Sequence, residues 1–76
     1  MNSPVKQRLI LFLSYLKIGQ KRFALNCGLS AGFVNSIVKS IQPDTLHKIS
    51  MQYPELNTGW LLTGEGEMLK LKNETH

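Results

Sequence analysis

The sequence predicts an all-α fold, a compact bundle of five helices, and three observations support this prediction. Apolar residues recur at helical spacing, capping and breaking residues separate the apolar segments, and no pair of alternating strands is evident. The chain has 76 residues, which suits one domain with a single core. We expect helices at 4–16, 20–27, 31–40, 43–53 and 58–63 within a domain of residues 1–69, followed by a flexible tail at 70–76.

The first predicted helix is justified by its apolar face and by its ends. Its face consists of residues at the spacing of one side of a helix: Val5, Leu9, Phe12, Leu13 and Leu16. Ser3 and Pro4 suit the cap and the first turn, and the cation and glycine at 17–19 are typical of a helix end. Ile10 and Leu11 widen the apolar surface, so this helix either packs on two sides or shares a face with a second subunit.

The second and third predicted helices surround a short turn. Gly28 can adopt the left-handed conformation that stops a helix, Leu29 returns to the core, and Ser30 is a good N-cap for the next helix. Ala24 is small where the two helices would cross. We expect their buried faces to consist of Phe23, Cys27, Val34, Ile37 and Val38.

The fourth and fifth predicted helices follow the same logic. Pro43 suits the first position of the fourth helix, and Asp44 suits its first turn because the helix dipole favours an acid there. Asn57 is the expected cap of the fifth helix and Gly64 its end, followed by a short extended piece around 68–71. The fourth helix should bury Leu46, Ile49 and Tyr53, and the large core residues of the whole bundle should be Phe12, Phe23, Tyr53 and Trp60.

Composition restricts the function classes. One cysteine, Cys27, excludes an intramolecular disulfide framework, and with His47 and His76 it gives no zinc-ligand spacing, so we expect a core cysteine, no metal and no cofactor. The longest apolar run near the N-terminus, Leu9 to Leu13, is too short for a secretory or membrane-spanning segment. Paired carboxylates and a phosphate loop are missing from the sequence. We expect a cytoplasmic protein that is not an enzyme, with no membrane partner and no small-molecule substrate.

Charge is distributed unevenly along the chain. The residues up to Tyr53 include seven basic side chains and a single acid, Asp44, whereas residues 54–76 carry four acids and two bases. A basic body of this kind suits a polyanion such as nucleic acid. The alternative is that the basic side chains only confer solubility.

One motif carries a family resemblance. The pattern Gln20-x-x-x-Ala24-x-x-x-Gly28-Leu29-Ser30-x-x-x-Val34-x-x-Ile37 resembles the helix-turn-helix signature of phage repressor and Cro-like (XRE-type) transcriptional regulators. The segment PELNTGWLLTGEGEML, residues 54–69, is similar to the one that closes this domain in phage and bacterial repressors, often ahead of a LexA-like self-cleaving half. The resemblance covers residues 5–69, so the chain is either a complete small regulator or the DNA-binding part of a longer one.

The resemblance implies a lambda-repressor-like fold, a homodimer on double-stranded DNA, and a recognition helix at 31–40 in the major groove. The implied DNA contacts are Gln20, Lys21, Arg22, Ser30, Ala31, Gly32, Asn35, Ser36 and Lys39. Asn35 is the best base reader because its amide matches the N6 and N7 edge of adenine. Ser36 can donate or accept, Lys39 meets a phosphate or a guanine, and Gln20 is the family's phosphate contact at a helix start. The small residues at 31–32 make direct readout sparse and leave specificity partly to DNA shape.

Several alternatives stay open on the sequence. The polar candidates on the reading helix, and the pair Lys21 and Arg22, are ordinary solvated side chains in the competing interpretation. Gly32 either lets the backbone approach DNA closely or marks a weak reader. Phe33 either packs beneath the fourth helix or touches a thymine methyl, and we favour a mixed role. A set near the C-terminus either pairs two subunits or closes the core: Trp60, Leu61, Met68, Leu69 and Leu71. The whole unit is alternatively a protein interaction module, such as an antirepressor, that does not bind DNA.

Overall fold

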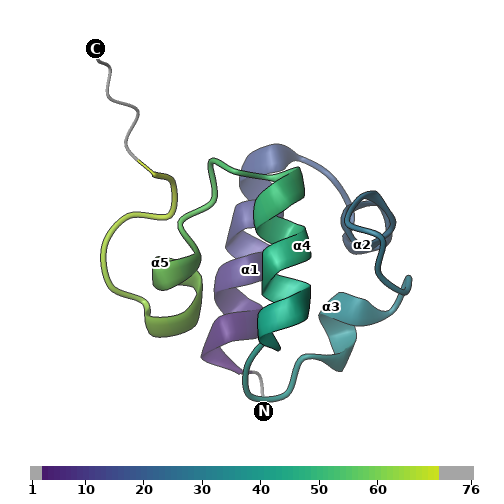
Figure 1. Cartoon of the computed structure of the whole chain (residues 1–76), viewed down its shortest axis with the longest axis horizontal. Helices are drawn as coiled ribbons and strands as arrows, with labels where there is room; N and C mark the ends of the chain where they lie inside the picture. The colour runs from purple at the N-terminus through teal and green to yellow at the C-terminus, as the bar shows by residue number, and fades with distance from the viewer. Residues whose placement is uncertain (1–2, 71–76) are drawn as a thin grey trace.

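Five helices make up the computed structural model, which describes residues 3–70 (Figure 1). They are α1 (Pro4–Leu16), α2 (Gln20–Asn26), α3 (Phe33–Ser36), α4 (Pro43–Gln52) and α5 (Thr58–Thr63). The all-α prediction is confirmed, α1 and α5 have the predicted bounds, and α2 and α4 each end one residue early. Only α3 differs substantially from its prediction.

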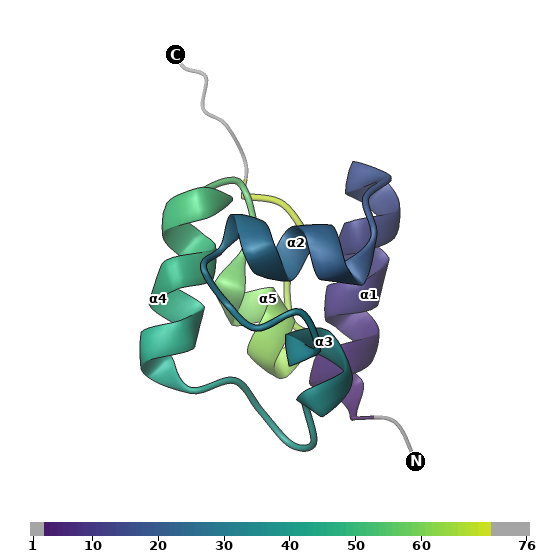
Figure 2. The same ribbon diagram turned by 90° about the vertical axis from the view of Figure 1, so that its right-hand side faces the viewer.

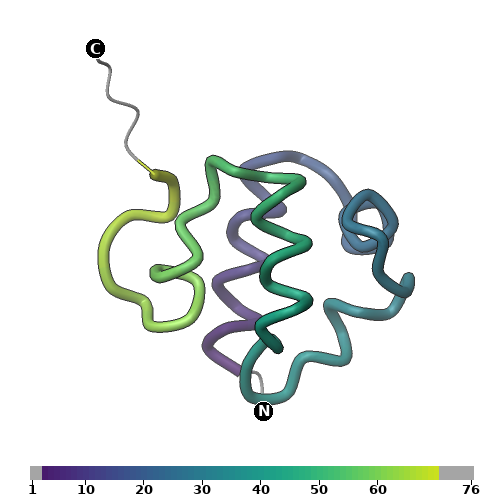
Figure 3. The backbone as a smooth tube through the Cα atoms, in the orientation of Figure 1, coloured from purple at the N-terminus to yellow at the C-terminus, as the bar shows by residue number. Residues whose placement is uncertain are grey.

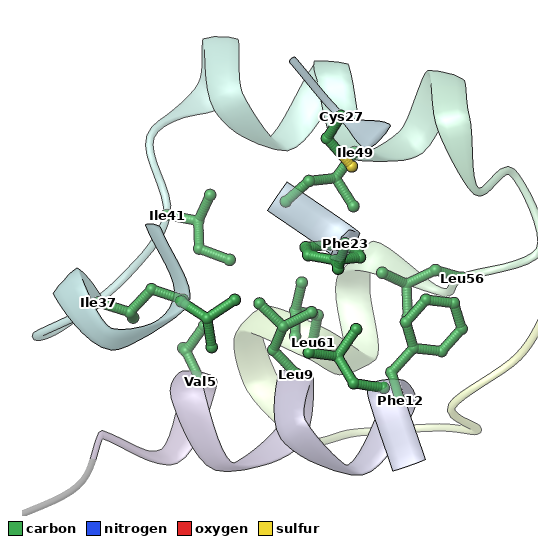
Figure 4. Close-up of a cluster of buried hydrophobic side chains, with 12 residues drawn as sticks. Val5, Leu9, Phe12, Phe23, Cys27, Ile37, Ile41, Ile49, Leu56 and Leu61 are labelled. Carbon is green, nitrogen blue, oxygen red and sulfur yellow. The ribbon is translucent and has the colours of Figure 1, made fainter. Parts of the chain in front are cut away.

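The helices surround one core on four sides. α5 lies on the side opposite α2 and α3 (Figure 1), and α1 and α4 flank the core on the two remaining sides (Figure 2). Side chains from all of these elements converge in the middle (Figure 4), where the largest fully buried ones are Phe12, Phe23, Leu9, Ile49, Leu56, Leu61 and Val34. None of the helices within residues 3–70 is long and apolar enough to cross a bilayer.

Aromatic rings connect three of the helices. Phe12 of α1 and Phe23 of α2 are fully buried, as predicted, whereas Tyr53 and Trp60 are half-buried and pack against the core. The Tyr53 ring stacks on Phe23 with centroids 5.3 Å apart and meets Phe12 edge-on at 5.8 Å. Such pairs add stabilisation beyond the burial of apolar area, and here they fix the end of α4 against α1 and α2.

The predicted caps of α1 and α5 are confirmed. The buried hydroxyl of Ser3 accepts hydrogen bonds from the backbone N–H groups of Val5 and Lys6, at 3.1 and 3.3 Å. Asn57 Oδ1 accepts from the N–H of Trp60 at 3.3 Å. Each cap satisfies backbone donors that the first turn of a helix leaves without partners.

The end of α1 differs from the prediction. Lys17, not Gly19, adopts the left-handed conformation, with φ 62°, and Gly19 is extended as the N-cap residue of α2. With Lys17 in this conformation the N–H of Ile18 reaches the carbonyl of Leu13 at 3.3 Å, and the Ile18 side chain packs against the core. The packing of the half-buried Ile18 against the core helps to offset the roughly 1–2 kcal/mol that a left-handed lysine costs.

The predicted helix at 31–40 is wrong in length and in one inward residue. α3 is a single turn, Ile37 after it is extended (φ −69°, ψ 121°), and Val38 is 75% exposed instead of buried. The segment between α3 and α4 is an open loop (Figure 3) in which Ile37 and Ile41 are buried. Apart from Lys39, residues 37–41 are β-branched or serine, which are weak helix formers. Burial of the two isoleucines therefore decides the backbone path.

The predicted capping of that helix by Ser30 is also wrong. Gly32 occupies the N-cap position of α3, and no side chain caps this helix. Ser30 contributes its backbone carbonyl instead, which accepts a hydrogen bond from the N–H of Phe33 at 3.0 Å. The residues 31–32 therefore form a turn before α3 and do not belong to a helix.

The chain after α5 returns to the segment before it. Leu56 and Leu69 form an isolated antiparallel bridge, in which the N–H of Asn57 donates to the carbonyl of Met68 at 2.9 Å and the N–H of Lys70 donates to that of Glu55 at 2.8 Å. This confirms the expected extended piece as far as residue 70. Lys70, the first residue of the predicted tail at 70–76, is held here by its N–H, and residues 71–76 lie outside the described residues.

Candidate nucleic-acid interface

The turn between α2 and α3 has the geometry that the glycine predicted. Gly28 has φ 74° and its N–H donates to the carbonyl of Leu25 at 3.0 Å, while the N–H of Leu29 donates to that of Ala24 at 2.8 Å. This pair of bonds is a Schellman motif, which ends a helix at a left-handed residue and directs the next apolar side chain inward. Leu29 accordingly packs against the core.

α2 and α3 are held together by their buried side chains. Phe23, Ala24 and Val34 have no exposed surface, and Cys27 and Ile37 are buried beside them. In Figure 2 the loop after α2 carries the chain back so that α3 lies next to the first half of α2. α2 and the one-turn α3 therefore pack against each other across a turn, and polar residues of this unit face outward.

The structure places most of the predicted contact residues on the surface. Gln20 is half-buried, and the other eight are exposed: Lys21, Arg22, Ser30, Ala31, Gly32, Asn35, Ser36 and Lys39. Lys21 and Arg22 lie at the start of α2, whereas the remaining six belong to the turn, α3 and the loop after it. These residues are accessible to a partner, but their contacts with DNA remain predictions.

Two polar side chains on α3 differ in what they can still bind. The Ser36 hydroxyl donates to the carbonyl of Phe33 at 2.6 Å, so its single proton is used within α3 and it is left as an acceptor. The Asn35 amide makes no hydrogen bond within residues 3–70, so its donor and acceptor groups are both available. Asn35 is thus the stronger candidate for reading a base edge.

Gly32 has no structural requirement for glycine. Its φ is −94°, which any residue adopts, and a Cβ built on it would meet no atom within 4 Å. The backbone at Gly32 is therefore open to solvent without a conformational reason for the missing side chain. This contrasts with Gly28, which also faces open space but has a positive φ.

The surroundings of this surface are basic. The first acid in the sequence is Asp44, so α1, α2 and α3 and the loops between them carry only positive charges. At the start of α2 the N-cap residue Gly19 provides no side-chain hydrogen bond, and the first turn contains no acid. The polar and charged side chains at this helix start are those of Gln20, Lys21 and Arg22.

One basic residue serves the fold instead. Arg8 is half-buried in α1, and its Nε and Nη2 atoms donate to the carbonyls of Leu61 and Leu62 at 2.8 and 3.0 Å. The guanidinium thereby satisfies the last turn of α5, where carbonyls lack partners and a cation is favoured. In the sequence Arg8 is recognisable only as a positive charge, because nothing in its local pattern indicates a partner 53 positions away.

The apolar residues for which the sequence leaves two interpretations open pack against the core. Phe33 is half-buried and packs against the core, which supports the packing interpretation for its ring. Leu61 is fully buried, and Trp60, Met68 and Leu69 pack against the core, so these four close the core of one chain. Leu71, the fifth residue of that set, lies outside the described part of the chain.

The single thiol is part of the core. Cys27 is buried, as predicted, and desolvation raises its pKa from 9.0 to about 11. A thiol with a raised pKa is a poor nucleophile near neutral pH. Between residues 3 and 70, no three histidine, cysteine, aspartate or glutamate side chains gather as metal ligands would.

Comparison with known proteins adds no relative to this picture. No protein-family model, no curated protein and no solved structure matches the chain.

Proposed function

We propose that the chain is a sequence-specific regulator of transcription that binds double-stranded DNA, and that it acts as a cytoplasmic repressor. One observation supports this most: the packed α2 and α3 unit exposes Asn35 and Lys39, and the sequence contains no acid before Asp44. The segment 30–39 would enter the major groove, and Lys21 and Arg22 would meet the phosphates beside it.

The roles within this proposal follow from the free groups. Asn35 reads an adenine through its unoccupied amide, and Ser36 accepts a hydrogen bond from a base or the DNA backbone. Gly32 and Ala31 allow the chain to approach the groove closely. Because α3 is a single turn, direct base contacts are few, and DNA shape supplies a large part of the specificity.

We also propose that two copies bind together. A single unit with so few base contacts gains useful affinity when a homodimer engages two half-sites about 34 Å apart. Sedimentation of the protein with a palindromic duplex should show two chains per duplex. A complex of one chain per duplex at saturation contradicts this part of the proposal.

The first experiment is selection of bound duplexes from a random pool, followed by mobility shift at two salt concentrations. Binding should weaken steeply as salt rises, because each phosphate that the protein neutralises releases counterions. Each such contact should contribute about −0.9 to the slope of log K against log salt. Asn35→Ala should lower the preference for the selected site by about 1–3 kcal/mol per lost base pair contact. The matched control is Gln52→Ala, which removes an exposed amide from α4.

A second candidate function is supported by exposed apolar side chains on the same unit. Leu25 in α2 is 55% exposed and Val38 after α3 is 75% exposed, which also suits a protein partner. A protein interaction module such as an antirepressor would shift no duplex from the pool even at low salt. That result would overturn the DNA-binding proposal.

A further inference from the structure

Val38 is the most exposed large apolar side chain within residues 3–70, at 75%. A single exposed valine is ordinary on a protein surface, so its exposure alone indicates nothing. Its position distinguishes it, because it lies two residues beyond the end of α3, three residues after Asn35 and one before Lys39. It is thus an exposed apolar group in the same segment as the polar and basic candidates Asn35 and Lys39.

The backbone around Val38 is fixed from both sides. Ile37 and Ile41 are each only 6% exposed, so the loop is anchored in the core before and after the exposed residues 38–40. Ile37 is extended, and consecutive side chains of an extended chain point to opposite sides, so burial of Ile37 directs Val38 outward. Valine is also stiff at χ1, so a contact made by its isopropyl group costs little side-chain entropy.

The major groove offers one apolar group to such a side chain. Among the four bases only thymine carries a methyl group on its major-groove edge, and cytosine presents an amine on the same side. Within the segment 30–39, Val38 is the large apolar side chain that is exposed, because Phe33 is half-buried and packed against the core.

Resting on the DNA-binding function proposed above, we propose that Val38 is a specificity-determining residue whose isopropyl group packs against the 5-methyl group of a thymine. Val38 and Asn35 together then read two chemically different features, a methyl group and an adenine edge. The surface gains sequence discrimination that its few hydrogen-bonding side chains do not supply alone.

The test replaces each thymine of the selected duplex, one at a time, by deoxyuridine, which removes only the methyl group. Wild-type protein should bind one of these duplexes about fourfold more weakly, the amount expected for burying one methyl-sized group. Val38→Ala should bind the thymine duplex about fourfold more weakly and lose the difference between thymine and uracil at that position. Met51→Ala, a 71% exposed residue of α4, is the control and should keep the full difference.

The outcomes separate this inference from the function on which it rests. Equal binding of every deoxyuridine duplex by wild-type protein, or an unchanged methyl dependence in Val38→Ala, overturns the role of Val38 while DNA binding stands. Absence of any bound duplex at low salt overturns both. Circular dichroism and thermal melting of Val38→Ala confirm that the fold is intact, which its exposure leads us to expect.

Discussion

The guanidinium of Arg8 in α1 donates from Nε to the backbone carbonyl of Leu61 in α5, at 2.8 Å. Gly64, which ends α5 with φ 84°, leaves room for it, since a Cβ at that position would lie 2.9 Å from the Nη1 atom. The first and last helices are therefore joined by a charged side chain that also completes the hydrogen bonding of a helix end. The arrangement makes Arg8 a stability determinant.

Replacing Arg8 by Met should destabilise the protein by about 1–3 kcal/mol, because the carbonyls of Leu61 and Leu62 lose their donors while they stay partly buried. For a chain of this size such a loss lowers the melting temperature by roughly 4–8 °C per kcal/mol. Thermal and urea denaturation measure the effect. Lys48→Met, the control, removes an exposed charge from α4 and should change stability by less than about 0.5 kcal/mol. Equal stability of the two variants would show that the Arg8 bonds contribute nothing.

The two glycines of the α2 and α3 unit should respond oppositely to alanine. Gly28→Ala should cost about 1–2 kcal/mol, because an L-residue is strained at φ 74°. Gly32→Ala should be neutral or stabilise by up to about 1 kcal/mol, because its φ is negative and no atom lies in the way. Urea titrations of both variants check the prediction, and a loss in Gly32→Ala as large as in Gly28→Ala would contradict it.

Gly32→Ala also tests close approach to DNA. If the backbone of Gly32 contacts the duplex as proposed, the added methyl group should weaken binding by tenfold or more without a loss of stability, which mobility shift with the selected duplex measures. Gln52→Ala is the control, because it changes an exposed residue of α4 that is not among the predicted contacts. Unchanged affinity in Gly32→Ala would mean that this glycine marks a weak reader.

Removal of the buried N-cap hydroxyl by Ser3→Ala should destabilise α1 by about 1 kcal/mol, since the N–H groups of Val5 and Lys6 lose their acceptor. Ser3→Asp should restore most of this stability because a carboxylate caps the same groups. Chemical denaturation of the three proteins is the measurement. Failure of the aspartate to restore stability would point to packing of the buried Ser3 side chain as the larger effect.

The raised pKa of Cys27 has a consequence for stability at alkaline pH. The folded protein holds the thiol proton up to about pH 11, whereas the unfolded chain releases it near 9.0, so stability is retained below pH 9 and is lost between pH 9 and 11. The difference in unfolding free energy between wild type and Cys27→Ala should therefore shrink across that range. Denaturation at a series of pH values tests this. A constant difference would show that the thiol titrates equally in both states.

Much of the fold follows from local chemistry in the sequence. Ser3, Asn57 and Gly28 sit where caps and turns require their particular side chain or backbone freedom, and each acts as predicted. The bounds of α1 are predicted correctly because its apolar spacing runs over 13 residues and Ser3 and Pro4 mark its start. Local rules succeed where a single element carries its own boundary signals.

The errors arise where tertiary burial overrides those rules. Lys17 takes the left-handed conformation because Ile18 has to reach the core. The helical pattern around Val38 does not form a helix, because the chain there is an open loop that buries both Ile37 and Ile41. The structural role of Arg8 is not predictable for a related reason, since its partner carbonyls are backbone groups that no sequence pattern displays. Eight of the nine predicted contact residues lie at exposed positions and Gln20 is half-buried, and exposure alone does not identify what a side chain binds.

The two buried isoleucines that anchor the loop after α3 also allow the exposed residues of this loop to change without loss of the fold. Because Ile37 and Ile41 carry the burial of this segment, the side chains at 38–40 can be exchanged for a cost within about 0.5 kcal/mol each. A protein built this way tolerates mutation at its outermost residues while its core stays constant. Randomising 38–40 should therefore yield a library of folded proteins with altered partners, which makes the loop a natural starting point for redesign.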